Sequence, residues 1–310
     1  MVQADCLKKV VVVCGATASG KSKLAVDIAE TFGGEIVSAD SIAVYRGLDI
    51  GSAKPDETER KKVPHHLIDV VDPKDDFSVA EYEEKALSAI EQIHAENKLP
   101  VICGGTGYFI DAILFKKSYG GCKKNEELRR EFDMIFKTEG ALALFEKLRA
   151  VDPETAEKLS PNDFLRVSRA LEIFYVTGKK KSEIADEMKP RFSYIAFSIN
   201  YPREVLYDRI NERVDKMFER GLIGEVKGLL LKGVSASAQS MQGIGYKEVA
   251  EGLMTGQSEE EIAEIVKMNT RRYAKRQITY FKRMKNQYLL EPEFAFGQAK
   301  TILYNERFID

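Results

Sequence analysis

The chain has 310 residues, of which 44% are hydrophobic, and its 47 lysines and arginines nearly balance 49 aspartates and glutamates, for a formal net charge of −2. This composition excludes a uniformly basic nucleic-acid coat and a long disordered chain, and no apolar run approaches the ~18 residues of a transmembrane helix. The length suggests about two domains. The apolar run Val10–Cys14 is too short for a signal peptide, and Cys6, Cys14, Cys103 and Cys122 form no CxxC pair. We therefore expect reduced thiols in a cytoplasmic protein.

Short β-branched runs alternate with helical stretches in the first third of the chain. Strands separated by helices indicate βαβ units and a parallel sheet. The expected strands are Val10–Cys14, Glu35–Ala39, Leu67–Val71 and Val101–Cys103, and the expected helices are Lys23–Phe32 and a helix from the capping box at Ser78 to about Asn97.

The next stretch has few strand signals and several helical ones. Asn162 or Asp163 caps a helix in which apolar residues recur at spacings of three and four, and Gly178 ends it. This pattern is typical of an amphipathic helix in a small helical domain.

A strand returns at Tyr194–Ile199, and the remainder is mostly helical, with one long helix expected over Glu259–Met284. We therefore expect an α/β fold, with a parallel sheet core flanked by helices and formed by residues 1–115 and 191–310. Residues 116–190 are expected to form a helical insertion domain.

The strongest local signal is an octapeptide that fits the phosphate-binding pattern G-x-x-x-x-G-K-[ST] between a buried strand and a helix, as in P-loop NTPases. Its glycines let backbone N–H groups turn toward one oxyanion, and the following helix presents its positive end. Lys21 adds a mobile positive charge at the outer phosphate, and the Ser22 hydroxyl is a candidate Mg²⁺ ligand. The pattern specifies a di- or triphosphate without identifying it as ATP. The candidate phosphate-binding residues are Gly15, Ala16, Thr17, Ala18, Ser19, Gly20, Lys21 and Ser22.

Asp40 follows the second expected strand, at the edge where open parallel sheets bind their ligands. A carboxylate there can take a proton from a nucleophile, bind Mg²⁺, or only cap the next turn. At the matching edge of another strand, Gly104–Gly107 contains glycines that permit close approach. The Thr106 hydroxyl in this segment can bond a phosphate oxygen or a base edge, although the segment can equally be a simple turn.

Two further groups of polar residues are less specific. His65, His66 and Asp69 have side chains that ligate metals, but no further ligand follows them at a recognisable spacing, so we assign them no metal. Arg209 and Arg213 are four residues apart and share a helix face. They can close over a phosphate or form a solvated charged face, and spacing does not decide between the two.

Lys267–Lys285 contains eight basic residues and no acidic one. On a helix, Arg272, Arg276, Thr279 and Arg283 fall on one stripe. In a chain of net charge −2, this concentration favours a phosphate-backbone partner, and the alternative is a solvated helix face.

These motifs, in this order, resemble those of the tRNA dimethylallyltransferases, the bacterial tRNA isopentenyltransferase family. The resemblance spans nearly the whole chain, and DIGSAKP and AKRQIT are far more diagnostic than the phosphate loop. The matching stretches are GATASGKSKLA (Gly15–Ala25), SADSIAVYRGLDIGSAKP (Ser38–Pro55), HHLIDVVDP (His65–Pro73), GGTGYFIDAIL (Gly104–Leu114), PNDFLRVSRALE (Pro161–Glu172), GIGYKEV (Gly243–Val249) and TRRYAKRQITYF (Thr270–Phe281).

The resemblance implies an enzyme that transfers a dimethylallyl group from dimethylallyl diphosphate to N6 of the adenosine at position 37, just 3′ of the tRNA anticodon, with Mg²⁺ as cofactor. The phosphate loop then holds the prenyl diphosphate, with Ser22 at the metal. Four residues are implied to be catalytic: Asp40 as the general base toward N6–H, Thr106 at the reaction centre, and Lys21 and Arg213 at the diphosphate. We expect a monomer that binds the anticodon stem-loop.

The resemblance also implies tRNA contacts from the core, the insertion and the basic helix. The implied residues are Asp40, Ser41, Ile42, Ala43, Thr106, Leu165, Arg166, Val167, Ser168, Arg169, Gln242, Gly243, Gly245, Tyr246, Lys247, Arg272 and Arg276.

Four residues, Ala16, Ile42, Ala43 and Tyr280, depart from those common in the family. Ala43 lacks the amide that commonly contacts a nucleotide in the family, so the resemblance implies no such amide contact at this position. No zinc-finger spacing follows the basic helix, unlike in the eukaryotic relatives, and this favours a bacterial protein.

Two other classes of protein remain as alternatives at this stage. A P-loop kinase of nucleosides or small metabolites needs the same loop, but it leaves the basic helix and the insertion unexplained. An RNA-binding module with a relict loop explains the basic helix, but it leaves Lys21, Ser22 and Asp40 without a purpose.

Overall fold

The computed structural model describes residues 7–184 and 187–309, so Cys6 lies outside the described residues. The other three cysteines carry free thiols. Within the described ranges, no helix is long and apolar enough to cross a membrane.

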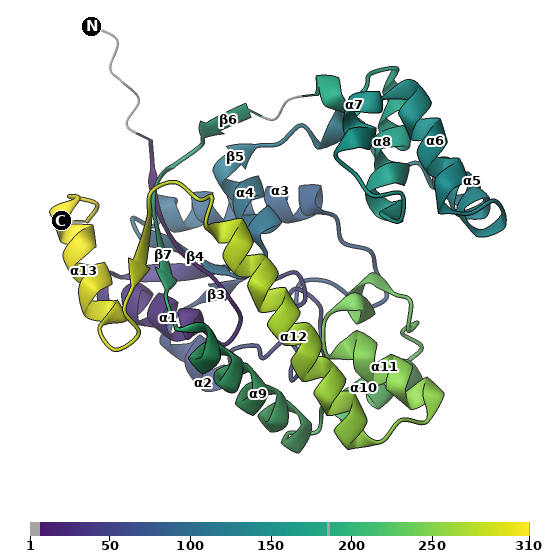
Figure 1. The fold of residues 1–310 in the computed structure, drawn as a ribbon. Helices are drawn as coiled ribbons and strands as arrows, with labels where there is room; N and C mark the ends of the chain where they lie inside the picture. The colour runs from purple at the N-terminus through teal and green to yellow at the C-terminus, as the bar shows by residue number, and fades with distance from the viewer. Residues whose placement is uncertain (1–6, 185–186, 310) are drawn as a thin grey trace, which may run out of the picture. The chain divides into compact units, whose positions relative to one another are not determined.

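The chain divides into two compact units (Figure 1). The first, which we call the core unit, comprises Met1–Leu114 and Arg191–Asp310. The second, which we call the insertion, comprises Phe115–Pro190. Each unit has a hydrophobic core of its own.

The core unit is built on a six-stranded sheet in the order β3-β2-β4-β1-β7-β8, in which every neighbouring pair is parallel. Val10–Val13 in the middle of the sheet are fully buried, as expected for a parallel strand covered on both faces. The strands are β1 (Lys9–Cys14), β2 (Gly34–Ser38), β3 (His65–His66), β4 (Leu99–Gly104), β7 (Ser193–Ile199) and β8 (Gln287–Leu290). The predicted α/β fold with a parallel sheet core is confirmed.

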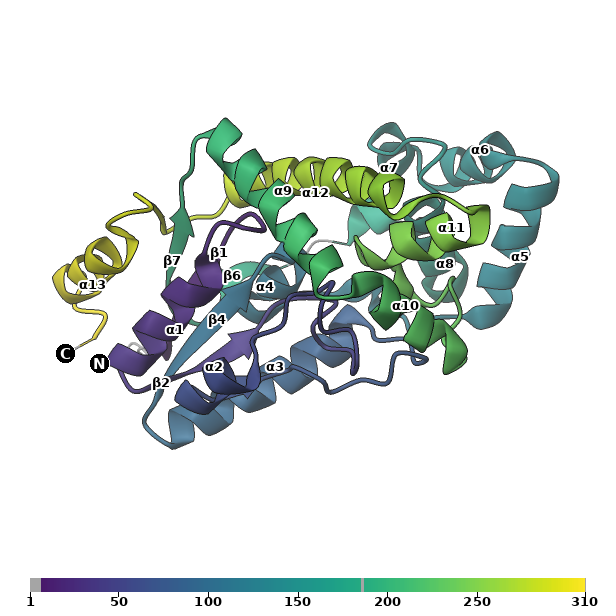
Figure 2. The same ribbon diagram turned by 90° about the horizontal axis from the view of Figure 1, so that it is seen from below.

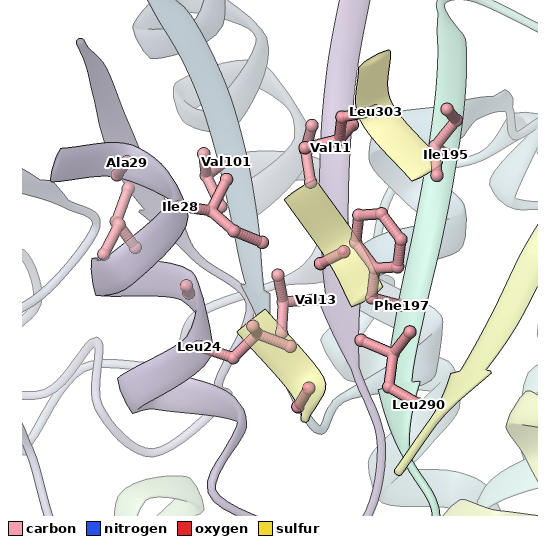
Figure 3. Packing of buried hydrophobic residues seen from close by; sticks show 14 of the residues in the cluster. Val11, Val13, Leu24, Ile28, Ala29, Val101, Ile195, Phe197, Leu290 and Leu303 are labelled. Atoms are coloured by element: carbon pink, nitrogen blue, oxygen red, sulfur yellow. The ribbon is translucent and has the colours of Figure 1, made fainter. Parts of the chain in front are cut away.

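Helices cover both faces of this sheet and extend beyond its carboxyl edge (Figure 2). Figure 3 shows Leu24 and Ile28 of α1, together with Leu303 of α13, packing against Val11 and Val13 of β1. The helices of the core unit are α1 (Lys21–Thr31), α2 (Glu57–Lys62), α3 (Val79–Ala95), α4 (Gly107–Leu114), α9 (Arg203–Glu219), α10 (Leu222–Leu231), α11 (Tyr246–Thr255), α12 (Glu259–Phe281), α13 (Ala295–Asn305) and the 3₁₀ turn η3 (Gln239–Gln242).

One predicted strand is wrong, because Leu67–Val71 does not form one and the third strand is the two-residue β3 instead. Leu67 (φ 63°) and Asp69 (φ 59°) have left-handed backbone, which a strand cannot contain. The Asp69 carboxylate binds Lys54 Nζ at 2.6 Å and Arg60 Nη1 at 2.8 Å. These ion pairs hold the segment in a looped path that its β-branched composition does not reveal.

The last strand, β8, was not predicted, since its sequence QYLL has no alternating pattern and follows directly on the long basic helix. It pairs in parallel with β7. The predicted helices α1, α3 and α12 are confirmed, although α12 ends at Phe281 rather than Met284.

The insertion is helical, with a small antiparallel pair at its two ends. Asp163 caps α8 by accepting the Arg166 N–H at 3.3 Å, and Gly178 (φ 71°) ends that helix, as the sequence predicts. The elements are β5 (Phe115–Lys116), η1 (Tyr119–Gly121), α5 (Glu126–Thr138), α6 (Ala141–Val151), α7 (Pro153–Glu157), α8 (Phe164–Thr177), η2 (Lys181–Glu183) and β6 (Glu187–Pro190).

A buried carboxylate organises the insertion. Glu172 of α8 is fully buried, and it accepts hydrogen bonds from Arg129 Nε (3.0 Å), from the Asn125 N–H (2.6 Å) and from Arg169. Burial opposes the charged form of Glu172, but these hydrogen bonds outweigh it and hold its pKa below the usual value. Glu172 therefore ties the start of α5 to α8.

We expect Glu172→Leu to lower the free energy of unfolding by about 3 kcal/mol, because it leaves the two arginines without their buried partner. Since the native pKa of Glu172 is lowered, this difference exists above the ordinary glutamate pKa of about 4.3 and is lost as the pH falls through the native pKa. Urea denaturation of both proteins at several pH values measures it. Glu131→Gln, an exposed change on α5, is the control. An equal effect of the two changes would contradict the role of Glu172.

Candidate active site

The phosphate loop connects β1 to α1 at the carboxyl edge of the sheet. Gly15 (φ 134°) and Gly20 (φ 84°) have backbone angles that other residues rarely adopt. Gly20 is the N-cap of α1 and provides no side-chain cap, so the first N–H groups of the helix remain available to an anion. The Ser19 hydroxyl is buried and has no hydrogen-bond partner among the described residues. These features fit a bound phosphate group.

Lys21 lies close under this loop, with its Nζ donating to the carbonyl of Ala16 at 3.3 Å. Burial and the nearby Arg213 guanidinium lower the pKa of Lys21. No carboxylate within the described ranges forms a salt bridge with either cation, and Asp40 acts on both only as a nearby charge. Because unpaired cations in a desolvated site are unfavourable, the loop is electrostatically suited to a multiply charged anion.

A cleft of about 410 Å³, which we call the phosphate cleft, opens over the loop. Arg209 and Arg213 both face it from α9, and Arg209 Nε donates to the Ala18 carbonyl at 2.9 Å. The structure thus decides against a merely solvated face for these two arginines. The residues that line the phosphate cleft are Ala18, Gly20, Lys21, Ser22, Ala53, Pro55, Glu59, Arg209, Glu212, Arg213, Lys216, Met217 and Arg220.

Asp40 directly follows β2 at the same edge. Its Oδ1 accepts the N–H groups of Ile42 (2.9 Å) and Ala43 (3.1 Å), whereas Oδ2 has no hydrogen-bond partner in the described part of the chain. The carboxylate therefore caps the next turn with one oxygen and keeps the other for a ligand. Thr106 lies beside it, since its Oγ1 accepts the Ser41 N–H at 3.1 Å.

A second cleft of about 370 Å³, which we call the Asp40 cleft, lies on this side of the site. Arg213 and Met217 line both clefts, so the two clefts adjoin at these two residues. The residues that line the Asp40 cleft are Thr17, Asp40, Ser41, Ile42, Gly51, Ser52, Arg213, Val214, Met217, Gln239, Gln242, Gly243, Ile244, Val266, Thr270, Tyr273 and Arg276. Two ligands can therefore meet beside Asp40 and Arg213.

Gln277 of α12 joins the two loops at the sheet edge, although the sequence did not single it out. Its Oε1 accepts the Thr17 N–H at 2.9 Å, and its Nε2 donates to the Gly105 carbonyl at 3.0 Å. A Cβ on Gly105 would lie 2.2 Å from Gln277 Nε2, and one on Gly107 would lie 2.2 Å from the Tyr280 ring. The Gly104–Gly107 segment is thus more than a turn, because its glycines admit α12 to the site. The AKRQIT motif contains the glutamine, but only the fold shows what it contacts.

The basic residues of α12 and the segment after it separate into two groups. Lys267 pairs with Asp215 at 2.7 Å, and Arg271 donates to Asn211 at 2.6 Å, so these two stabilise the packing of α12 on α9. The others are largely exposed and have no carboxylate partner among the described residues. They are Arg272, Lys275, Arg276, Lys282, Arg283 and Lys285, which we call the basic face.

The residues implied to contact tRNA fall into different environments. In the core unit, Gln242 and Gly243 line the Asp40 cleft, whereas Lys247 is exposed. Tyr246 does not fit the expected contact, because its side chain is fully buried and its hydroxyl donates to Glu225 at 2.6 Å. Gly245 is also buried, as the N-cap of α11.

The implied residues of the insertion also divide. Leu165 is 77% exposed and Arg166 is exposed, so both can reach a partner. Val167 and Ser168 are buried in the insertion, and Arg169 binds Glu172, so the helix pattern places these three inward. For them the expected contact does not fit this structure.

The histidine pair has structural partners. His66 Nε2 lies 2.6 Å from the Glu35 carboxylate, and His65 Nδ1 lies 2.7 Å from the Val63 carbonyl. Among the described residues, no group of three or more His, Cys, Asp or Glu side chains can hold a metal ion.

The fold and the site define an α/β protein of the P-loop type that can bring a phosphorylated ligand to a second ligand at a carboxylate. Residues 43–284 match the model of the IPP transferase family. The chain belongs to this family, and it is an enzyme of the prenyltransferase class.

Curated relatives and solved structures agree with the family. The chain is 46% identical to a tRNA dimethylallyltransferase of Thermoanaerobacter sp. over 88% of this chain and 89% of that one. It is 42% identical to that of Acetivibrio thermocellus over 97% of both chains. The tRNA isopentenylpyrophosphate transferase of Bacillus halodurans has a similar structure, with a TM-score of 0.70, 39% identity and coverage of 96% and 94%. A eukaryotic dimethylallyltransferase acting on tRNA gives a TM-score of 0.83 at 31% identity, with coverage of 97% and 79%.

We expect Gly105→Ala to lower the free energy of unfolding by about 2 kcal/mol, because the new methyl group overlaps the Gln277 amide. In a Gln277→Ala background the same change should have little further effect, since the overlapping group is gone. Urea denaturation of the four proteins measures this coupling. Gly297→Ala, where a methyl group meets nothing within 4 Å, is the control. Additive effects would show that the two positions do not interact in this way.

Proposed function

We propose that this enzyme transfers a dimethylallyl group from dimethylallyl diphosphate to N6 of the adenosine at position 37 of tRNA and releases diphosphate. The observation that carries the proposal is the meeting of the phosphate cleft and the Asp40 cleft at Arg213. One cleft is suited to an anion, and the other offers Asp40 Oδ2, which has no hydrogen-bond partner among the residues that the structure describes. A kinase would also use both clefts, but it leaves the basic face without a use.

The phosphate cleft is the site for the prenyl donor. Negative charge grows on the diphosphate as its bond to the allylic carbon breaks. The N–H groups of the loop, Lys21 and Arg213 are fixed cations and dipoles that stabilise this charge, and they do so more strongly where water is excluded. The pKa of Lys21, lowered in the free enzyme, rises when a diphosphate binds beside it.

Mg²⁺ fits the donor site in the manner of other phosphate loops. The described residues offer no cage of carboxylates and histidines, and Mg²⁺ at phosphates commonly uses one or two protein oxygens together with phosphate oxygens and water. Ser22 lines the phosphate cleft and is the residue that would hold the ion. The ion would supply further charge neutralisation for the leaving diphosphate.

The Asp40 cleft is the site for the adenine. The exocyclic amine is a poor nucleophile, so it gains most from being held in line with the allylic carbon. Asp40 Oδ2 accepts the N6–H and takes its proton as the N–C bond forms and the C–O bond to diphosphate breaks. Thr106 and the Tyr273 ring border the place of the base, which has to leave its stack to enter.

The basic face supports the binding of the tRNA backbone. Arg276 belongs both to this face and to the lining of the Asp40 cleft. A tRNA whose backbone phosphates bind the basic face therefore has its reacting base next to the Asp40 cleft. Both clefts are formed by a single chain, which supports a monomeric enzyme, and we propose that it acts in the cytoplasm.

The proposal is tested by incubating the protein and tRNA with Mg²⁺ and either dimethylallyl diphosphate or ATP. Transfer of the prenyl group to adenosine 37 with the first and no phosphoryl transfer with the second is the expected result. Phosphoryl transfer from ATP without prenylation would replace the proposal with a kinase, and binding of tRNA without either reaction would reduce the protein to an RNA-binding module.

Asp40→Asn is expected to lower transfer by ~10²–10⁴, the usual contribution of a general base, because the amide accepts a hydrogen bond but takes no proton. The fold and much of the tRNA affinity should remain. Single-turnover transfer at saturating substrates across a Mg²⁺ series measures the effect. If added Mg²⁺ restores the rate, Asp40 is a Mg²⁺ ligand rather than the general base. If turnover stays near normal, Asp40 is neither.

Lys21→Ala is expected to reduce transfer by ~10²–10³ while tRNA affinity stays close to wild type, because the lost charge acts on the developing diphosphate. Rates under saturating dimethylallyl diphosphate and tRNA binding are measured on the same preparations. Lys23→Ala, which removes an exposed lysine paired with Asp27 on α1, is the matched control. Unimpaired transfer by the Lys21 variant would show that the loop is not the diphosphate site.

Binding of tRNA should weaken steeply with salt, and Arg272→Ala with Arg276→Ala should lower the steepness. Each lost phosphate contact reduces the slope of log affinity against log salt by roughly 0.7–0.9. Lys227→Ala, an exposed change on α10, should leave the slope as it is. If the arginine pair behaves like Lys227, the basic face is only solvated.

A further inference from the structure

A single carboxylate accepts hydrogen bonds from several consecutive backbone N–H groups of the DIGSAKP segment. Glu225 of α10 accepts the N–H groups of Asp49 (3.1 Å), Ile50 (2.8 Å) and Gly51 (3.3 Å). The next N–H, that of Ser52, donates at 3.3 Å to the hydroxyl of Tyr246. That hydroxyl donates in turn to Glu225 at 2.6 Å. Four consecutive backbone N–H groups therefore converge on the Glu225 carboxylate and the Tyr246 hydroxyl that is bound to it.

Consecutive backbone N–H groups that converge in this way form an anion-binding site known as a nest. Here the bound anion is the carboxylate of Glu225 rather than a ligand. The nest requires glycine at position 51, because a Cβ there would lie 2.6 Å from the buried ring of Tyr246. Charge-assisted hydrogen bonds are roughly twice as strong as neutral ones, so Glu225 fixes the segment more firmly than a turn alone would.

The segment held in this way borders the reacting groups. Gly51 and Ser52 line the Asp40 cleft, and the Ser52 carbonyl accepts a hydrogen bond from Arg213 Nη2 at 3.4 Å. In the part of the chain that the structure describes, Arg213 makes no other hydrogen bond and no ion pair. The direction of the Arg213 guanidinium therefore depends on the Ser52 carbonyl, and that carbonyl depends on Glu225.

We propose that Glu225 is a positioning residue for prenyl transfer: it holds the Asp49–Ser52 backbone so that the Ser52 carbonyl aims Arg213 at the diphosphate. The inference rests on the proposed function for the identity of the donor. Glu225 lines neither cleft, so it acts through Arg213 rather than on a substrate.

The test is the affinity for inorganic diphosphate with Mg²⁺, measured by calorimetry, together with steady-state kinetics. Glu225→Gln replaces one acceptor oxygen by an N–H₂ group facing backbone donors. It should weaken diphosphate binding and raise the KM for dimethylallyl diphosphate roughly tenfold, the effect of one charge-assisted hydrogen bond. The affinity for tRNA should change much less than the affinity for diphosphate, since the basic face, which binds the tRNA backbone, is untouched.

A double-mutant cycle separates positioning from general damage. Arg213→Gln alone should also weaken diphosphate binding, and adding Glu225→Gln to it should have little further effect. Tyr246→Phe keeps the buried ring but removes the hydroxyl that links Ser52 to Glu225, so it should give a smaller defect of the same kind. Tyr246→Phe remains informative if Glu225→Gln fails to fold.

Glu35→Gln is the matched control, because Glu35 is buried and binds His66 and Lys98 near the opposite edge of the sheet. It should lower stability without changing diphosphate affinity. Additive effects of Glu225→Gln and Arg213→Gln, or a Glu225 defect in tRNA affinity alone, would overturn the inference. Because diphosphate binding needs no turnover, a wild-type protein that binds diphosphate and transfers no prenyl group would overturn the proposed function but not the role of Glu225.

Discussion

All neighbouring strands of the core sheet are parallel, and the site depends on this constraint more than on any other. Parallel strands deliver their carboxyl ends to one edge, so the segments after β1, β2 and β4 meet although they are far apart in the sequence. The Thr106 N–H donates to the Ala39 carbonyl at 3.1 Å, and Thr106 Oγ1 accepts the Ser41 N–H. These two contacts fix the Asp40 turn against the β4 loop, and the phosphate loop lies beside them.

Helices α9 and α12 supply further side chains of the site at the sheet edge. Gln277 of α12 connects the phosphate loop to the β4 loop, and Arg213 of α9 faces both clefts. Such close approach needs residues without side chains at the contact points, which is why Gly105 and Gly107 face the glutamine and Tyr280. The Tyr280 hydroxyl donates to Asp111, so this departure from the usual family residue is supported by a hydrogen bond within the fold. Ala16, a second departure, packs in a small apolar cluster with residues of α9 and α12.

Positive charges of the protein are concentrated at the phosphate cleft and on the basic face, although the net charge of the chain is close to zero. The net charge is only −2, but the cations at the phosphate cleft and on the basic face have few carboxylate partners. In two other places buried or half-buried acids are paired with bases, in the Glu172 network of the insertion and in the Asp69 cluster with Lys54 and Arg60. Unpaired cations are tolerated where phosphate groups are expected to supply the missing charge.

The sequence by itself determined the elements and motifs whose signals are local. The strand before the phosphate loop, the capping box at Ser78 and the Asp163 cap are examples, because each depends on hydrogen bonds or packing within a few residues. The tertiary structure decided the rest. It showed that Leu67–Val71 is a loop held by ion pairs, that Tyr246 is buried, that Gln277 joins two loops of the site, and that Glu225 binds the Asp49–Gly51 backbone. These facts arise from contacts between residues that are nine to more than two hundred positions apart, and no local pattern in the sequence records which groups will meet.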